Sequence, residues 1–263
     1  MKKYIELNLW PDGAPEPNGL NGAEDLSVPG FIANVSNPTL MVFPAEKPNG
    51  KAIIMCPGGG LTKVAIGHEG YDLAEWFNDR GISFAILKYR MPNRHKDILL
   101  KDIQQGLRIM SQHKEEWHFN RLGVMGASIG GYIAASASVF FTINTRPDFQ
   151  ILFYPVISMD DDITHINSRE QILGGQLQEE LIRAYSVNLH VTSHTPPAFI
   201  TAASDDTAVS PENSISYYQA LLWSKVPTSL HIYPKGGHSF AFKDSFPYKK
   251  ELLNELKKWL SNI

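Results

Sequence analysis

Short apolar runs alternate with amphipathic segments along most of this chain. The runs at 51–56, 82–87 and 122–125 are almost continuously apolar, which is typical of strands buried on both faces of a parallel sheet. Between these runs, apolar residues at helical spacing predict helices over 71–79 and 97–113. Because strands alternate with helices, we expect an α/β protein with a doubly wound, mainly parallel sheet and helices on both faces.

The same patterns predict further strands at 39–43, 150–154, 197–203 and 229–233, and further helices at 131–140, 211–223 and 247–260.

Two segments depart from the alternation. Residues 9–38 are rich in Pro, Gly and Asn, which predicts an irregular arm on the surface. Residues 160–195 contain no expected strand and one short expected helix, over 177–185, so we interpret them as an insertion that caps the rim of a functional site. The sequence shows no internal repeat and no boundary, so we expect a single domain over residues 1–263.

Charge and apolar length limit the classes of partner. The net charge is −3, which gives no basic surface for nucleic acid or an acidic membrane. No apolar run approaches the roughly 18 to 20 residues that a membrane-spanning helix needs. We therefore expect a neutral or small substrate, no nucleic acid and no membrane. The pattern specifies no oligomeric state, and a homodimer is left open.

The single cysteine and the first residues bear on the cellular compartment. Cys56 excludes a disulfide within the chain, and its place at the end of an apolar run predicts a buried structural thiol. The chain begins with Met1-Lys-Lys3 but no apolar signal segment follows. We expect a cytoplasmic protein, although an exported protein that had lost its signal would look the same.

The segment Gly126-Ala-Ser-Ile-Gly130 is the most informative motif. It is a G-x-S-x-G pattern between an apolar strand and a helix of small residues. A serine on such a sharp strand-to-helix turn has a strained backbone, and the helix directs its N-terminal N–H groups at developing negative charge. This is the geometry of a nucleophile elbow, and it favours Ser128 as the nucleophile of an acyl transfer.

A nucleophilic serine requires a base and an acid, which this kind of fold supplies in the chain order Ser, Asp or Glu, His. His238 lies in a glycine-containing loop between the last expected strand and the last helix, so we expect it to be the base. We expect Asp206 to be the acid, because it opens a D-x-x-V-x-P pattern after the strand at 197–203. Asp205 and Asp160 are the alternatives, and an aspartate left over would cap a turn.

The oxyanion of an acyl transfer requires N–H donors. The glycine-rich segment Cys56-Pro-Gly-Gly-Gly60 follows an early strand, and we expect the N–H groups of Gly59, Gly60 and Ile129 to be the donors. The segment lacks the G-K-[ST] ending of a phosphate-binding loop, so a nucleotide site is not expected.

Two patterns resemble metal sites without the residues that such sites need. His190 and His194 have zinc-like spacing but no accompanying glutamate, in a stretch that does not favour a helix. The run Asp160–Asp162 lacks the alternation of a calcium loop. We expect no metal and no cofactor.

On these motifs the chain resembles the α/β-hydrolase superfamily, and within it bacterial esterases related to acetyl xylan esterases. The resemblance implies a serine esterase that hydrolyses short-chain carboxylic esters, with acetyl groups on a sugar or xylan-derived oligosaccharide as the expected substrate. The chain departs from the pattern at Pro57, where many relatives have His, and at Ile129, where relatives often carry Ala. We expect the larger Ile129 to narrow the acyl site.

Four other functions share this scaffold: a general carboxylesterase or lipase-like enzyme, a dienelactone-type hydrolase, a peptidase and a catalytically silent binding protein. A peptidase of this fold usually has an additional propeller or cap domain, for which 263 residues leave no room. A silent protein typically lacks the serine or the histidine. The complete set of motifs favours an enzyme.

Overall fold

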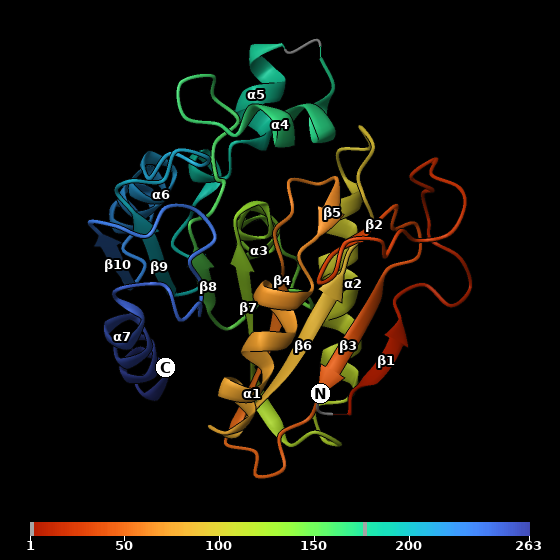
Figure 1. The fold of residues 1–263 in the computed structure, drawn as a ribbon, viewed down its shortest axis with the longest axis vertical. Helices are drawn as coiled ribbons and strands as arrows, with labels where there is room; N and C mark the ends of the chain where they lie inside the picture. Colours follow the sequence, from red (N-terminus) through yellow and green to blue (C-terminus); the bar gives the residue numbers. More distant parts are fainter. Residues whose placement is uncertain (1–2, 176–177) are drawn as a thin grey trace.

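In the computed structural model, residues 3–175 and 178–263 are described (Figure 1). Eight strands form one sheet in the order β1-β3-β6-β4-β7-β8-β9-β10. Their bounds are β1 Ile5–Asn8, β3 Thr39–Phe43, β4 Gly50–Cys56, β6 Ile82–Lys88, β7 Phe119–Ala127, β8 Gln150–Phe153, β9 Ala198–Ala203 and β10 Thr228–Tyr233. The six strands from β6 to β10 in this order are parallel, whereas β3 is antiparallel to both of its neighbours. The expected mainly parallel sheet is confirmed.

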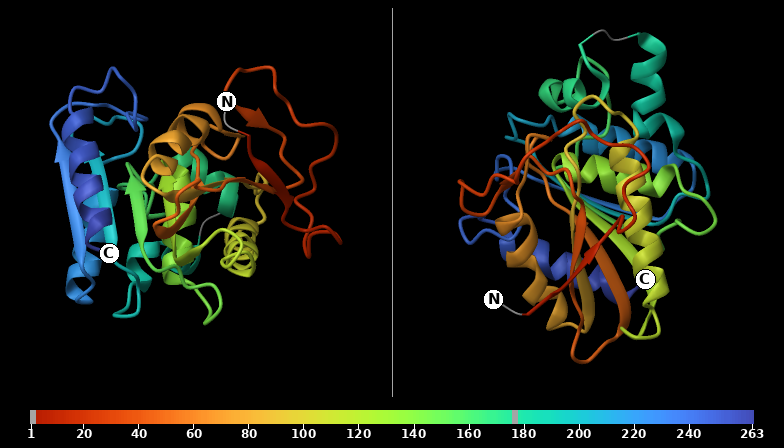
Figure 2. Two further views of the ribbon diagram at one scale, coloured as in Figure 1. Left: turned by 90° about the horizontal axis from the view of Figure 1, so that it is seen from below. Right: turned by 90° about the vertical axis from the view of Figure 1, so that its right-hand side faces the viewer.

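Helices cover both faces of the sheet (Figures 1 and 2). Helices α1 and α7 lie on one face, and α2, α3 and α6 lie on the other. Their bounds are α1 Asp72–Asn78, α2 Ile98–Gln112, α3 Ile129–Val139, α6 Glu212–Trp223 and α7 Lys249–Ser261. Since both faces are covered, β6, β8 and β9 are buried along their whole length, which explains their continuous apolar sequences.

The insertion contains two helices, α4 Ile166–Leu173 and α5 Glu179–Tyr185. Figure 1 shows both above the carboxyl ends of the parallel strands. The helix expected over 177–185 corresponds to α5, and residue 177 lies outside the described residues. Helix α4 was not expected; its N-cap is His165, whose ring accepts the Ser168 N–H.

The N-terminal arm is held against the body of the protein by specific contacts. Within it, β2 Ile32–Ala33 pairs antiparallel with β5 Lys63–Val64, which lies just after the glycine-rich segment. The arm is also fixed to the body of the protein by Trp10, whose indole donates a 2.9 Å bond to the buried Asp102. Most of the arm has no helix or strand, but a short pairing and a buried polar anchor fix it to the rest of the protein.

The burial of Cys56 agrees with the expected structural thiol. Cys56 has no exposed surface and burial raises the pKa of its thiol, so the thiol stays protonated. Among the described helices, none is long and apolar enough to cross a membrane.

Candidate active site

Ser128 lies on the turn between β7 and α3. Its backbone has φ 56° and ψ −126°, a strained conformation for a residue with a side chain. Glycine is required on both sides of it. A Cβ on Gly126 would lie 2.1 Å from the Gly130 carbonyl oxygen, and one on Gly130 would lie 1.9 Å from that of Cys56. The G-x-S-x-G pattern therefore reflects close backbone packing around the serine.

Ser128, His238 and Asp206 are joined by two hydrogen bonds. His238 Nε2 lies 2.8 Å from Ser128 Oγ, and His238 Nδ1 lies 2.7 Å from Asp206 Oδ2. A carboxylate only accepts, so it fixes the ring proton on Nδ1 and leaves Nε2 to accept the serine proton. The Asp206 side chain is 1% exposed and that of His238 is 22% exposed, so the bonded carboxylate is shielded while the imidazole remains accessible.

The other expected acids do not contact His238. Asp205 accepts the Gly237 N–H at 2.7 Å, which fixes the loop that carries the histidine. Asp160 Oδ1 accepts the Asp162 N–H in a turn of the insertion. The second oxygen of Asp206 accepts the N–H groups of Ala208 and Val209 at 2.9 Å each. Each of the two adjacent aspartates therefore holds a loop in place, but only Asp206 reaches the imidazole.

The glycine-rich loop is held on several sides. Tyr89 donates its hydroxyl to the Pro57 carbonyl at 2.9 Å, and the Gly59 carbonyl accepts the Lys63 N–H at 3.3 Å. A Cβ on Gly59 would lie 2.0 Å from the Lys63 carbonyl oxygen, so this position requires glycine. Within 3–175 and 178–263, neither Gly59 nor Gly60 donates its backbone N–H to a protein acceptor. Both groups are thus available to a ligand.

Ile129 begins α3, so its N–H has no partner within the helix. Its side chain has no exposed surface and belongs to the hydrophobic core. The expectation that Ile129 narrows the acyl site is therefore wrong, because the side chain packs into the core.

Three residues near this site were not expected from the sequence. Glu69 is 1% exposed and accepts the Gly58 N–H at 2.7 Å and the Tyr154 hydroxyl at 2.9 Å. The Tyr154 ring lies 4.9 Å from the His238 ring, centroid to centroid. His165 of the insertion is half-buried, and its pKa is lowered chiefly by burial and further by the charge of His238. The one available signal was Gly67-His-Glu-Gly70, an acid between glycines just after the glycine-rich loop.

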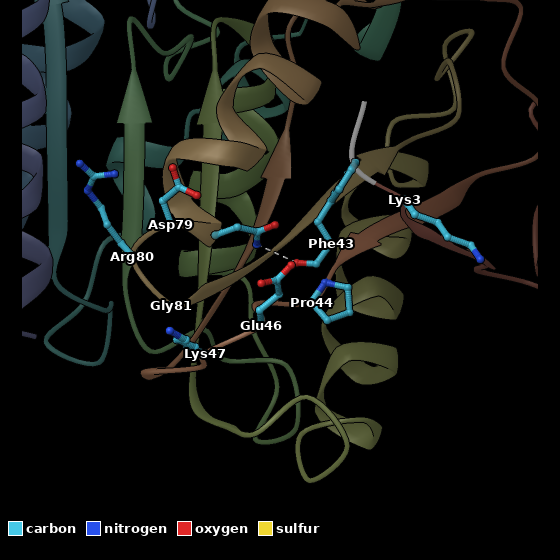
Figure 3. Close-up of a pocket in the computed structure, with 9 residues that line it drawn as sticks. Lys3, Phe43, Pro44, Glu46, Lys47, Asp79, Arg80 and Gly81 are labelled. Atoms are coloured by element: carbon cyan, nitrogen blue, oxygen red, sulfur yellow. Dashed lines mark hydrogen bonds between the residues drawn. The ribbon is translucent and has the colours of Figure 1, made fainter.

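Other features of the described residues do not extend the site. No group of three or more His, Cys, Asp or Glu in that part of the chain is arranged to hold a metal ion. A cavity of about 660 Å³ lies at the opposite end of the sheet, between the end of β3 and the end of α1 (Figure 3). Its lining contains none of the residues of the candidate site described above. Ligands of open α/β sheets bind at the carboxyl ends of the strands, and this cavity lies at the other end.

This sheet, the strained serine and the Ser–His–Asp chain of hydrogen bonds define an α/β-hydrolase. Within that class, the chain belongs to the prolyl oligopeptidase family, whose sequence pattern matches residues 78–263.

Two curated relatives are similar in sequence. Over 242 residues the chain is 40% identical to an acetylxylan esterase of Xylanibacter ruminicola, covering 89% of this chain and 50% of that protein. Over 204 residues it is 30% identical to endo-1,4-beta-xylanase B of Butyrivibrio fibrisolvens, covering 71% of this chain and 32% of that protein. The chain therefore spans about half the length of the first relative and about a third of the second.

Among solved structures, the chain is similar to an acetyl ester-xyloside bifunctional hydrolase from Caldicellulosiruptor lactoaceticus. The TM-score is 0.83 at 30% identity, and the match covers 98% of this chain and 96% of that one. A carboxylesterase from Lactobacillus plantarum has a TM-score of 0.75 at 20% identity, over 99% of this chain and 98% of that one, which supports the fold alone.

Proposed function

We propose that this protein is a serine esterase that removes acetyl and other short acyl groups from sugars, with acetylated xylan-derived oligosaccharides as its substrate class. The observation that carries the proposal is the continuous hydrogen-bonded chain from Asp206 through His238 to Ser128. The names of the acetylxylan esterase and of the acetyl ester-xyloside hydrolase support the choice of acyl group and alcohol.

In the proposed reaction, Ser128 Oγ attacks the ester carbonyl while its proton passes to His238 Nε2. The imidazolium that forms is stabilised by the carboxylate of Asp206, which lies 2.7 Å from Nδ1. His238 then donates the proton to the departing sugar hydroxyl, leaving an acetyl group on Ser128. A water molecule, deprotonated by the same histidine, releases acetate and restores the serine.

We assign the stabilisation of the oxyanion to the N–H groups of Gly59, Gly60 and Ile129. Among the described residues none of the three has a protein acceptor, and Ile129 also lies at the positive end of the α3 dipole. Loss of one such donor typically lowers kcat by about 10²–10³-fold. These groups therefore provide a large share of the proposed rate enhancement.

Acetate release tests the proposal. The wild type is incubated with acetylated xylo-oligosaccharides, with p-nitrophenyl esters from acetyl to octanoyl, and with a proline p-nitroanilide that represents the peptide substrates in the family's name. The proposal predicts fastest turnover of the acetyl esters. Activity on p-nitrophenyl esters without acetate release from any sugar would instead indicate a general carboxylesterase, and cleavage of the anilide alone would indicate a peptidase.

A further inference from the structure

Glu69 is a buried acidic residue that the proposed reaction does not use. It lies in a single π-helical turn, Gly67–Tyr71, directly before α1. Only 1% of its surface is exposed. A buried carboxylate is costly unless its oxygens are paired, so its partners indicate what it is retained for.

The first partner of Glu69 is the backbone of the glycine-rich loop. Oε2 accepts the Gly58 N–H at 2.7 Å. A Cβ on Gly58 would lie 2.7 Å from this oxygen and 2.8 Å from Ser128 Cβ. The carboxylate, the Gly58 peptide and the serine are therefore packed against one another without space for a methyl group, and a shift of the carboxylate is transmitted to the loop.

The second partner of Glu69 leads to the histidine. Oε1 accepts the Tyr154 hydroxyl at 2.9 Å. Burial raises the pKa of Tyr154 well above its usual value, and the charge of Glu69 raises it further, so the hydroxyl stays protonated and donates. The Tyr154 ring meets the His238 ring edge-on, with centroids 4.9 Å apart. One carboxylate thus contacts both the glycine-rich loop and the residue that packs against the base.

The adjacent residue His68 does not form a strong pair with this carboxylate. His68 Nε2 lies 3.7 Å from Glu69 Oε1, and the pKa of His68 is lowered chiefly by burial. Its imidazole is therefore mostly neutral at pH 7. The two short bonds from Gly58 and Tyr154 remain as the main contacts that satisfy Glu69.

We propose, on the basis of the proposed esterase function, that Glu69 is a positioning residue that couples the oxyanion loop to the catalytic histidine. Its bond to Gly58 fixes the peptide that precedes the free N–H groups of Gly59 and Gly60. Its bond to Tyr154 holds the ring that packs against His238. Because both effects concern groups that act most strongly in the transition state, Glu69 contributes to kcat and not to substrate affinity.

Three substitutions separate positioning from charge. Glu69→Ala removes both bonds, and we expect kcat for p-nitrophenyl acetate to fall by about 10–100-fold while KM stays within about threefold of wild type. This fall in kcat is smaller than the one caused by losing a whole oxyanion donor. Glu69→Gln keeps an oxygen for the Gly58 N–H, and its amide can donate to the Tyr154 oxygen, so kcat should stay within about fivefold of wild type. Glu69→Asp keeps the charge but shortens the reach, so it should behave like Ala.

Controls distinguish this proposal from the esterase proposal. Wild type and Ser128→Ala are measured first: if the wild type is inactive, or Ser128→Ala is equally active, the proposed function has failed. Glu75→Ala, which removes an exposed carboxylate from the neighbouring helix α1, should leave kcat unchanged. Circular dichroism establishes which variants fold, and Glu69→Asp replaces Glu69→Ala in the comparison if the alanine variant does not fold.

The measurements then decide the role of Glu69. A kcat of Glu69→Ala or Glu69→Asp within about threefold of wild type would overturn the positioning role. A Glu69→Gln variant as slow as Ala would also overturn it, because the charge and not the geometry would then be required. Loss of kcat in Ala and Asp with recovery in Gln supports the coupling.

Discussion

Asp206→Asn is the substitution that isolates the electrostatic role proposed for the acid. The substituted amide would keep an oxygen for the N–H groups of Ala208 and Val209, so the turn that Asp206 Oδ1 now holds should survive. The amide N–H would face His238 Nδ1, where the carboxylate oxygen now lies at 2.7 Å. The imidazole would then have to accept at Nδ1 and carry its proton on Nε2, where it cannot accept the serine proton.

The size of the effect follows from the burial of this pair. The Asp206 side chain is 1% exposed, so little solvent screens its interaction with the imidazolium. In a serine protease triad the same Asp-to-Asn change lowers kcat by about 10⁴-fold. We expect a fall of about 10³–10⁴-fold here, which is about 4–5.5 kcal/mol of transition-state stabilisation.

The assay is steady-state hydrolysis of p-nitrophenyl acetate at pH 7.5, with circular dichroism to verify folding. The neighbouring Asp205→Asn is the matched control, because it keeps an acceptor for the Gly237 N–H and should leave kcat within about threefold. If Asp206→Asn retains more than about a tenth of the wild-type kcat, or if Asp205→Asn loses as much, the assignment of the acid is refuted.

Three further predictions concern stability and the elbow. Asp102→Ala should lower the free energy of unfolding in urea by about 3–5 kcal/mol, because it leaves the buried Arg90, which is 1% exposed, without its carboxylate partner. An unchanged urea midpoint would contradict this. Gly130→Ala should abolish activity and lower the melting temperature, since its Cβ would overlap the Cys56 carbonyl oxygen; wild-type kinetics would contradict the close packing. His68, His165 and His231 all have a pKa lowered from 6.5 chiefly by burial. Below pH 6.5 the unfolded chain therefore binds protons that the folded protein does not. The free energy of unfolding should be highest above pH 6.5 and should fall as the pH is lowered below it; a flat profile in urea titrations would count against these environments.

The fold was largely predictable because its strands are buried on both faces. Continuous apolar runs located β4, β6 and β9 to within one or two residues of their observed bounds. Strand β7 is longer than expected: it begins at the buried Phe119, passes through the exposed polar residues Asn120 and Arg121, and ends at Ala127. The edge strand β1 was missed because three of its four residues are exposed and it has no buried face.

The candidate site was predictable as far as it depends on local motifs and chain order. The elbow, the acid loop and the histidine loop each carry their own residue pattern, and the structure brings Ser128, Asp206 and His238 within hydrogen-bonding distance. Glu69 was not recognised, because its significance comes from its burial and from its bonds to Gly58 and to Tyr154, which lies 85 residues away in the sequence. Ile129 was misjudged for a related reason: its position in the motif does not reveal which way the side chain packs.

The most direct test of the esterase assignment is acetate release from acetylated xylo-oligosaccharides by the wild type and by Ser128→Ala. Circular dichroism of both proteins ensures that a folded variant is compared. The assignment predicts steady release by the wild type and a loss of several orders of magnitude in Ser128→Ala. Equal release by the two proteins, or none by the wild type, would contradict it.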